Sequence, residues 1–279
     1  MHDIRLNTLP TRPSPRPVDC NKGDFGAVAI IGGAPGMVGA VLLAARAALF
    51  CGAGRVYAVV LDTRIGLDPT VPELMVAHPD ILPLLPLLPH PACRVVGPGL
   101  GQSAAAHAAL LAVVAMDQPL LLDADALNLI AADPALRERV RARGAPTVLT
   151  PHPGEAGRLL GMSSQAVQLD RPGSVARLSE SFRAVVVLKG AGTLVKAPAG
   201  EIWRNTSGNP GMAAPGMGDV LAGIIAALIA QGMTVEAAAV VGVWLHGAAA
   251  DMAVEEGLGP RGLTASELPP RVRRLLNSA

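Results

Sequence analysis

The sequence predicts a single three-layer α/β/α domain with a mostly parallel central sheet. Short aliphatic runs alternate along the chain with longer alanine-rich stretches, and near-continuous apolar strands between helices are typical of a parallel sheet covered on both faces. The composition is 51% hydrophobic but only 2% aromatic, so the core must consist of Ala, Val, Leu and Ile. No repeat and no linker rich in Gly, Ser or charge divides the 279 residues, which one large core can accommodate.

The expected elements follow one another from residue 27 onward. Residues 1–21 contain four prolines after residue 9 and no apolar stretch typical of a secretory signal, so we expect an extended arm there and the domain over residues 22–279. Strands are expected at Ala27–Ile31, Arg55–Val60, Arg94–Val96, Pro119–Leu122, Thr147–Leu149 and Val185–Leu188, with Thr193–Lys196 and Glu201–Arg204 as a further pair. Helices are expected at Val38–Cys51, Ala104–Met116, Ala126–Ile130, Glu155–Leu160, Ser174–Phe182, Val220–Gln231, Val235–Glu255 and Pro270–Leu276.

Charge and cysteine content exclude several classes of partner and site. The chain carries 23 Lys and Arg against 22 Asp and Glu without a long basic run, which predicts no binding to nucleic acid or to an anionic membrane. The cysteines Cys20, Cys51 and Cys93 are widely spaced and odd in number. They are therefore interpreted as reduced thiols of a cytoplasmic protein, with neither a disulfide framework nor a zinc site.

Two apolar stretches are too short or too rich in proline to span a membrane. The apolar run after Asp219 covers 11 residues before Gln231, whereas a bilayer requires about 20. The segment "ILPLLPLLPHP" (Ile81–Pro91) has a proline at every third position, and each proline removes a backbone donor. We expect this segment to be a covered loop or a contact with a partner.

Chemistry-bearing residues gather where the expected strands end. In a parallel sheet these ends meet at one edge, which is where ligands bind in such folds. The five strand-end segments are "AIIGGAPGMVGA" (Ala29–Ala40), "VVGPGLG" (Val95–Gly101), "LLLDADALNLI" (Leu120–Ile130), "VLTPHPGE" (Val148–Glu155) and "VVVLKGAGT" (Val185–Thr193).

Each of these segments also has a purely structural interpretation. Asp123 can cap the helix that follows it, and His152, fixed between two prolines, can be a structural histidine. Lys189 can be a solvated loop cation, or it can neutralise a phosphate bound by the N–H groups of the Gly190-Ala191-Gly192 turn. The glycines Gly32 and Gly33 alone lack the full dinucleotide-binding pattern.

The segment "NPGMAAPGMGDVLAGIIAAL" (Asn209–Leu228) carries the strongest signal. Gly216, Met217 and Gly218 offer successive N–H groups at the start of a long apolar helix, which predicts an anion hole. Asp219 near the first helical position could merely interact with the helix dipole, but that interpretation does not explain the glycines before it. Phosphoryl transfer requires donors for the transferred group and an acceptor for the proton of the attacking hydroxyl. This turn supplies both.

With these motifs in their order, the chain resembles the ribokinase-like superfamily and, within it, the ADP/ATP-dependent NAD(P)H-hydrate dehydratases. The likeness extends from about Lys22 to Leu268 and includes "GPGLG", "DADALN", "TPHPGE", "LKGAGT" and "PELMV" (Pro72–Val76) in addition to the segment after Asn209. The resemblance implies a ribokinase-like fold. It also implies transfer of a phosphoryl group from ADP or ATP to the C6 hydroxyl of (6S)-NADHX or NADPHX, followed by elimination of phosphate.

The resemblance assigns a role to each site residue. It implies that Asp219 is the catalytic base beside the anion hole. The adenine nucleotide site then comprises Lys189, Gly190, Ala191, Gly192, Thr193 and Gly218. The dinucleotide substrate site comprises Ala40, Gly99, His152 and Asp219, with Asn209 and Asp123 as groups that orient substrate or metal-bound water.

The same resemblance predicts partners and cofactors. Mg²⁺ is expected to bridge the nucleotide phosphates through water, with no side chain assigned as its ligand. ADP is expected to be used better than ATP, and the protein is expected to form a homo-oligomer, a tetramer, in the cytoplasm. A kinase of a small alcohol or vitamin precursor and a nucleotide sensor without catalysis are the alternatives.

One position departs from the family pattern. The family usually has T-G-G-x-G-D, whereas Ala214-Pro215 stands here in place of Thr-Gly. The change removes a hydroxyl group and a backbone donor from the outer part of the anion hole.

Overall fold

The computed structural model describes residues 1–87 and 92–278. Its strands form one sheet in the order β1-β10-β9-β8-β7-β6-β5-β2-β3-β4, in which every neighbouring pair is parallel except those that β9 makes with β8 and β10. The strands are β1 (His2–Ile4), β2 (Ala27–Gly32), β3 (Arg55–Val60), β4 (Met75–Ala77), β5 (Ala92–Val96), β6 (Leu120–Leu122), β7 (Thr147–Leu149), β8 (Val185–Leu188), β9 (Leu194–Lys196) and β10 (Ile202–Asn205).

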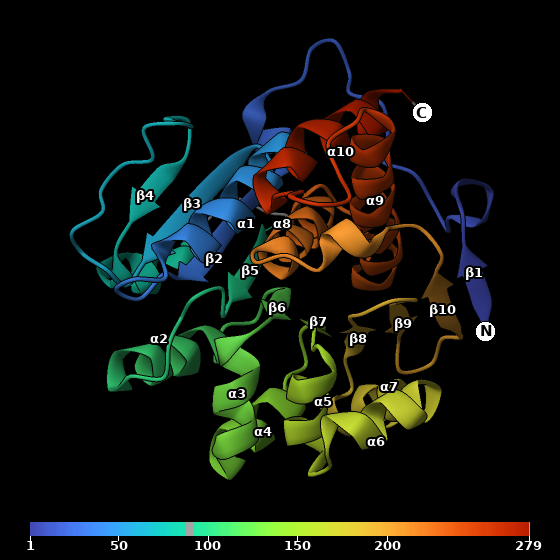
Figure 1. Cartoon of the computed structure of the whole chain (residues 1–279). Coiled ribbons are helices and arrows are strands. Elements are labelled where there is room, and N and C mark those ends of the chain that lie inside the picture. The colour runs from blue at the N-terminus through green and yellow to red at the C-terminus, as the bar shows by residue number, and fades with distance from the viewer. Residues whose placement is uncertain (88–91, 279) are drawn as a thin grey trace.

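Helices cover both faces of this sheet (Figure 1). The first face carries α1 (Val38–Phe50), α8 (Met217–Ala230), α9 (Val235–Glu255) and α10 (Leu268–Asn277). The second face carries α2 (Ala104–Val114), α3 (Asp125–Ala132), α4 (Pro134–Arg141), α5 (Pro153–Leu160), α6 (Ser164–Leu169) and α7 (Arg171–Phe182). Short 3-10 turns occur at η1 (Leu6–Thr8), η2 (Lys22–Phe25), η3 (Pro79–Leu87), η4 (Pro210–Met212) and η5 (Ala265–Glu267). The structure thus confirms the three-layer α/β/α architecture.

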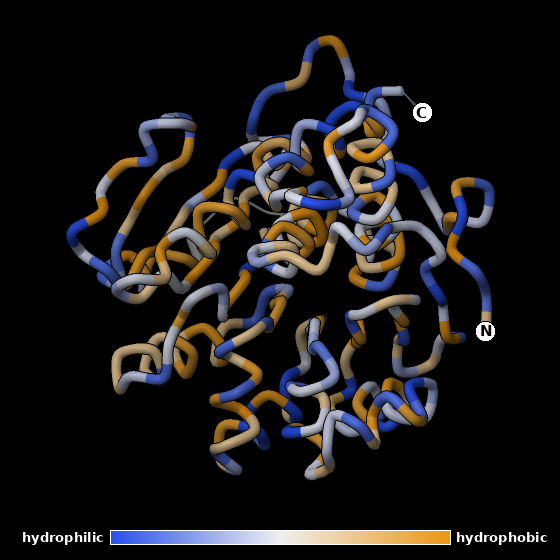
Figure 2. Tube along the Cα trace, in the orientation of Figure 1, coloured by the Kyte–Doolittle hydropathy of each residue, from blue (hydrophilic) through white to orange (hydrophobic). Residues whose placement is uncertain are grey.

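The side-chain alternation of the strands separates two hydrophobic cores. In β2, Val28 and Ile30 join the core under α1, α8 and α9, whereas Ala29 and Ile31 join the core under α2 to α7. This is the period of two that a strand imposes. Apolar residues therefore fill the strands and the inner faces of the helices, as the orange segments of Figure 2 show.

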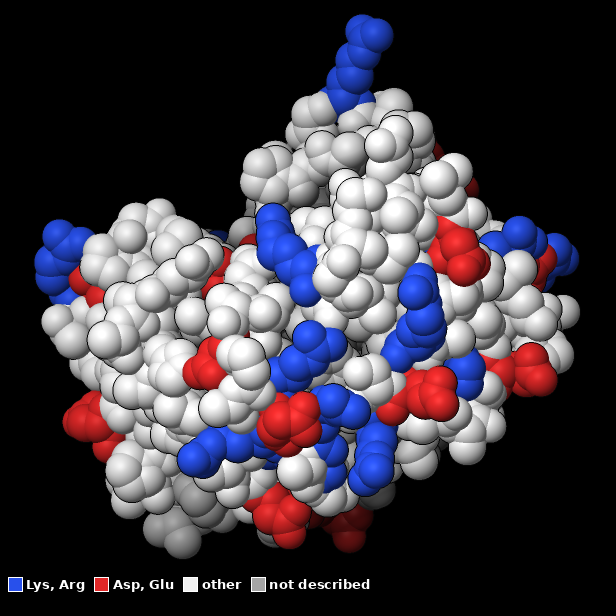
Figure 3. Space-filling view, turned by 90° about the horizontal axis from the view of Figure 1, so that it is seen from below, with Lys and Arg blue, Asp and Glu red and all other residues white. Residues whose placement is uncertain are grey.

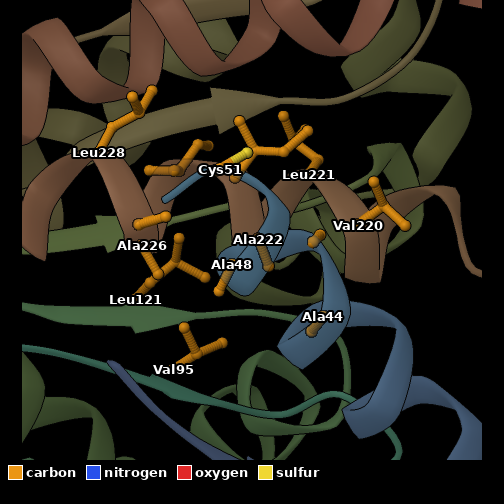
Figure 4. Packing of buried hydrophobic residues seen from close by; sticks show 14 of the residues in the cluster. Ala44, Ala48, Cys51, Val95, Leu121, Val220, Leu221, Ala222, Ala226 and Leu228 are labelled. Atoms are coloured by element: carbon orange, nitrogen blue, oxygen red, sulfur yellow. The ribbon is translucent and has the colours of Figure 1, made fainter. Parts of the chain in front are cut away.

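Small residues let α1 and α8 lie close together above β2 and β5. A Cβ atom on Gly223 of α8 would lie 2.1 Å from the carbonyl oxygen of Ala44 in α1, so only glycine fits there. Ala48 and Ala222 lie in the same interface, and Val95 and Leu121 face it from the sheet (Figure 4). This packing fixes the position of α8 and therefore of its first residues.

Helix α9 is long and apolar enough to cross a membrane, but most of it is buried inside the molecule. Its 21 residues have a window of mean hydropathy 1.5, and 72% of that window is buried. The helix packs against α8 and α10. Within the described residues it is therefore a core helix of this fold.

The structure adds four elements that the sequence analysis did not predict: β1, β4, α4 and α6. β1 lies in the segment expected to be an extended arm and pairs with β10, with Asp3 opposite Arg204. In η3, Leu82 and Leu85 are buried while Leu84 is 56% exposed, so this part of the Leu-Pro segment is only partly covered. Residues 88–91 of that segment lie outside the described residues.

Candidate active site

The site lies at the carboxyl edge of the sheet, beside the start of α8. β5, β6, β7 and β8 are mutually parallel, so the residues that follow them meet there, as expected from the sequence. Lys189 follows β8, and its Nζ lies 2.6 Å from Oδ1 of Asp123, which follows β6. Nζ also lies 3.9 Å from Oε2 of Glu155 in α5. An ammonium and two carboxylates thus form the base of the site.

Burial of this ion pair decides between the two interpretations of Asp123 and of Lys189. The Asp123 side chain is 1% exposed and that of Lys189 is 17% exposed, so Lys189 is not a solvated loop cation. Ala124, with a φ of 48°, occupies the N-cap of α3, so Asp123 is not the helix cap. Its carboxylate is instead committed to Lys189.

The first turn of α8 approaches this pair. Gly216 is the N-cap with a left-handed φ of 85°, and Met217, Gly218 and Asp219 are the first three helical residues. The helix therefore begins three residues earlier than Val220, and Asp219 is its third residue. A Cβ atom on Gly218 would lie 3.2 Å from Nζ of Lys189 and 3.7 Å from Oδ2 of Asp123. Glycine thus brings free backbone N–H groups next to the ammonium.

Electrostatics leave Asp219 able to take up a proton near neutral pH. The pKa of Asp219 is raised to about 7, chiefly by burial and then by the charges of Asp123, Asp125 and Glu155, with Lys189 acting in the opposite direction. Burial alone would lower the pKa of Lys189, but Asp123, Glu155 and Asp219 outweigh that cost and raise it. Three carboxylates, those of Asp123, Glu155 and Asp219, therefore act on one ammonium. A carboxylate with a pKa near the working pH is suited to general-base catalysis.

A cavity of about 1020 Å³ opens beside this cluster. Lys189, the Gly190-Ala191-Gly192 turn and Thr193 form one part of its wall, and Met217 and Gly218 adjoin them. The end of β10 and the segment that follows it, as far as Pro215, form another part, and His152, Leu221 of α8 and two residues of α9 contribute the remainder. The structure thus brings every residue expected at the nucleotide site into one cavity.

Comparison with known proteins identifies the family. A family model described as NAD(P)H-hydrate dehydratase matches residues 28–269. The chain belongs to this family. It is 44% identical to the ADP-dependent (S)-NAD(P)H-hydrate dehydratase of Neisseria meningitidis over 94% of this chain and 88% of that protein. It is 47% identical to a bifunctional NAD(P)H-hydrate repair enzyme of Coxiella burnetii over 93% of this chain.

Length and fold complete the comparison. The chain spans about half of the Coxiella protein, 52% of its length. The ADP/ATP-dependent NAD(P)H-hydrate dehydratase of Bacillus subtilis, co-crystallised with ATP and Mg²⁺, superimposes with a TM-score of 0.79 at 28% identity. That superposition covers 95% of this chain and 93% of the other. The fold is therefore the ribokinase-like fold of a dehydratase.

The residues expected to line the dinucleotide lie in two places in this member of the dehydratase family. His152 and Asn209 line the large cavity, whereas Ala40 and Gly99 do not. A Cβ atom on Gly99 would lie 3.2 Å from Cβ of Ala40, so these two residues form a second group, at the start of α1 and just after β5. Asp123, Gly216 and Asp219 border the cavity without lining it. The substrate roles of these residues stay predictions.

His152 and Asn209 also have structural roles. Nδ1 of His152 caps α5 by accepting a hydrogen bond from the N–H of Gly154 at 2.9 Å, and its Nε2 lies 3.2 Å from Oε1 of Glu155. The Asn209 side chain accepts a hydrogen bond from the N–H of Gly211 at 3.0 Å. The structural interpretation of His152 is therefore confirmed, and its half-exposed ring also reaches the cavity, where its role toward the substrate stays a prediction.

Two charged residues that the sequence analysis missed hold the cavity loops in place. The guanidinium of Arg171 donates to the carbonyl oxygens of Leu188 at 3.0 Å and of Lys189 at 3.3 Å. The carboxylate of Asp251 in α9 accepts from the N–H of Gly208 at 2.8 Å and from Nδ2 of Asn209 at 3.0 Å. Neither residue lies in a recognisable motif, so no local pattern could have indicated them.

The N-terminal strand reaches the same cavity through Arg204. This arginine lines the cavity, and its Nε and Nη2 lie 2.8 and 2.7 Å from Oδ1 of Asp3 in β1. The parallel pairing of β1 with β10 places the two side chains next to each other. Residues before the family's matched region thus contribute to the wall of the site.

Proposed function

We propose that this protein dehydrates (6S)-NADHX and NADPHX to NADH and NADPH at the expense of ADP or ATP. The observation that carries the proposal is the position of Asp219 in the first turn of α8, where it has a pKa near 7, interacts with the charge of Lys189 and directly follows the glycine that approaches the Lys189–Asp123 pair. A base, an anion hole and a cation within one turn are the parts that phosphoryl transfer to a hydroxyl requires.

The proposed reaction has two steps, phosphorylation of the hydroxyl group and elimination of phosphate. Asp219 accepts the proton of the C6 hydroxyl while that oxygen attacks the terminal phosphorus and the nucleotide leaves with one phosphate fewer. The ring nitrogen lone pair then expels the phosphate from C6, and the neighbouring C5 releases a proton to water, which restores the reduced nicotinamide. Phosphorylation is needed because hydroxide is a poor leaving group. The N–H groups of Met217 and Gly218 stabilise the charge of the transferred group.

The charge balance of the site fits a nucleotide that arrives with Mg²⁺. Three carboxylates face a single ammonium, so a polyphosphate needs an additional cation to bind there. No group of three His, Cys, Asp or Glu side chains that could hold a metal occurs in the described residues. The phosphates and water would therefore hold the ion, with Asp123 and Asp219 accepting hydrogen bonds from its waters. When bound, Mg²⁺ neutralises charge on the phosphates.

ADP is proposed as the better phosphoryl donor, and the relative from Neisseria meningitidis carries ADP dependence in its name. The test is incubation of the protein with NADH hydrate and either ADP or ATP, following the return of reduced-nicotinamide absorbance. Recovery without nucleotide would contradict the proposed reaction, and faster recovery with ATP would contradict the donor preference.

The same assay separates the two alternative functions. A kinase of a small alcohol or vitamin precursor would consume nucleotide with a panel of alcohols and leave the hydrate unchanged. A nucleotide sensor would bind ADP without turnover of any substrate. The buried Lys189–Asp123 pair beside a base with a pKa near 7 favours catalysis over sensing.

A cytoplasmic homo-oligomer, a tetramer, is the proposed state of the enzyme. Leu67, Met75 and Leu84 are large apolar residues exposed around β4 and η3, and β4 is an edge strand of only three residues. Exposed apolar side chains beside a sheet edge favour self-association.

On the side of α3 to α7, basic side chains lie among acidic ones (Figure 3), and no nucleic-acid partner is proposed.

A further inference from the structure

His246 is a cavity residue that neither the sequence motifs nor the proposed reaction uses. It lies in the middle of α9, its side chain is 7% exposed, and it forms part of the cavity wall. Its Nε2 is buried and has no hydrogen-bond partner among the described residues. A buried polar atom without a partner costs free energy unless a ligand supplies one.

The imidazole of His246 is neutral at physiological pH. The pKa of His246 is lowered to about 4, chiefly by burial; a hydrogen bond with the backbone of Met217 opposes the shift, and the charge of Lys189 acts in the same direction as burial. A backbone group that favours the charged ring is a carbonyl oxygen accepting a ring N–H. Since Nε2 has no partner, Nδ1 donates that hydrogen bond and Nε2 presents a lone pair.

The surroundings of His246 suit an aromatic base better than a phosphate. Leu221 and Val243 lie in the cavity wall and are nearly fully buried, and the facing loop contributes Met212, Ala213 and Ala214. The polar part of the wall, from Lys189 to Thr193, is suited to phosphates. An apolar wall with one hydrogen-bonding group is the usual arrangement for a planar heterocycle.

We propose that Nε2 of His246 accepts a hydrogen bond from the exocyclic amino group of adenine and so selects adenine nucleotides. The inference rests on the proposed function, because it assumes that the cavity holds the nucleotide. A 6-oxopurine presents an oxygen where adenine has its amino group, so two lone pairs would face each other in the closed pocket. His246 is thus a specificity-determining residue that takes no part in the chemical steps.

The test is calorimetric titration of the full chain with ADP and with inosine diphosphate. The wild-type protein should bind ADP about 10- to 100-fold more tightly, the usual effect of a buried hydrogen bond that the analogue cannot make. In His246→Leu the difference should shrink to within about threefold, since the acceptor is lost and the apolar volume is kept. Leu221→Ala, the matched control, should weaken both nucleotides together and preserve their ratio.

Two results would overturn the inference: equal wild-type affinity for ADP and inosine diphosphate, or an unchanged ratio of the two affinities in His246→Leu. The first of these needs no variant, so a misfolded His246→Leu would not leave the inference untested. Preserved ADP selectivity without any hydrate turnover would contradict the proposed function alone and support the base contact.

Discussion

Two buried ion pairs of this protein differ in how their charges balance. Arg46 in α1 meets Asp68 with Nε and Nη2 each 2.7 Å from a carboxylate oxygen. Asp68 is fully buried and also accepts from the N–H of Thr70 at 3.0 Å. Lys189 meets Asp123 at 2.6 Å, but Glu155 and Asp219 add further negative charge around the same ammonium.

The difference distinguishes a structural pair from a functional one. At Arg46–Asp68 the two-pronged contact satisfies both partners, and although burial tends to raise the pKa of Asp68, the hydrogen bonds from Arg46 and Thr70 outweigh it and hold that pKa low. At Lys189–Asp123 the surplus of carboxylates keeps the pKa of Asp219 high. Such unbalanced charge costs stability, and its retention at the edge of a cavity is typical of an active site.

Removing the base should have the largest effect on activity. Asp219→Asn keeps the shape and the neighbouring N–H donors but cannot accept a proton, so turnover should fall by about 10²–10⁴. ADP affinity should hold or rise because a negative charge near the phosphates is lost. Steady-state rates and calorimetric titration measure both quantities. A fully active variant would contradict the assignment of the base.

The same variant should be more stable than the wild type at alkaline pH. The folded pKa of Asp219, about 7, lies above its ordinary value of 3.8, so its stabilising contribution is complete below pH 4 and lost as the pH rises through 7. The free energy of unfolding of Asp219→Asn should therefore exceed that of the wild type by about 1–3 kcal/mol at pH 8 and match it at pH 4. If urea titrations show that Asp219→Asn is inactive because it is unfolded, its loss of activity does not come from the missing base, and the catalytic interpretation is contradicted.

Breaking the Arg46–Asp68 ion pair should lower the free energy of unfolding and leave the turnover unchanged. Asp68→Asn leaves Arg46 with its charge unpaired and should lower the free energy of unfolding by about 2–4 kcal/mol at pH 7, since a quarter of Arg46 remains exposed. The loss of stability should diminish at acidic pH. The pKa of Asp68 is lowered in the folded protein, so its carboxylate stabilises the fold above its ordinary pKa of 3.8, and this contribution disappears as the pH falls through the folded pKa. The turnover of the folded fraction should be unchanged.

An apolar replacement of both partners provides the control. Arg46→Met combined with Asp68→Leu should recover most of the stability, as replacement of whole buried ion pairs generally does. A turnover loss as large as that of Asp219→Asn in either variant would show that the two pairs do not differ in the way proposed.

Removing the ammonium of Lys189 should change both the KM for the nucleotide and the pH dependence of kcat/KM. Lys189→Ala should raise the nucleotide KM by about tenfold while the hydrate KM stays the same, because a charge-assisted phosphate contact is lost. Since Lys189 lowers the pKa of Asp219, the rise of kcat/KM with pH should also move above pH 7.

Lys196→Ala is the matched control, because the ammonium of Lys196 donates to the carbonyls of Ala197 and Gly200 at 2.6 and 2.7 Å. That variant should leave both KM values and the pH profile as they are. Unaltered ADP affinity in Lys189→Ala would show that the ammonium serves the ion pair and not the nucleotide.

Restoring the family's glycine should have the smallest effect. Pro215→Gly returns a backbone donor to the loop that lines the cavity and should change turnover by less than about threefold, in the direction of activation. The added backbone freedom should cost about 0.4–1 kcal/mol of stability. Rates and melting temperatures measure the two effects, and a large loss of activity would show that Pro215 itself shapes the anion hole.

Local patterns in the sequence were sufficient to predict most of the fold. β3, β7 and β8 have the bounds expected from their aliphatic runs, and α9 spans Val235–Glu255 as expected. β4 and α6 were missed because they are short and lack a clear period. The start of α8 was placed too late because Met217 and Gly218 read as loop residues until the packing of α8 on α1 is known.

The sequence by itself determined the alternation of strands and helices, and with it the edge of the sheet where Asp123, Lys189 and Asp219 would meet, because each follows from residues adjacent in the chain. Only the tertiary structure decided which groups touch: Lys189 with Asp123, 66 positions apart, and Asp251 with Asn209, 42 apart. It also decided the burial of His246 and the raised pKa of Asp219. Burial and electrostatic interaction depend on everything within a few ångströms in space, and distance along the chain does not specify those neighbours.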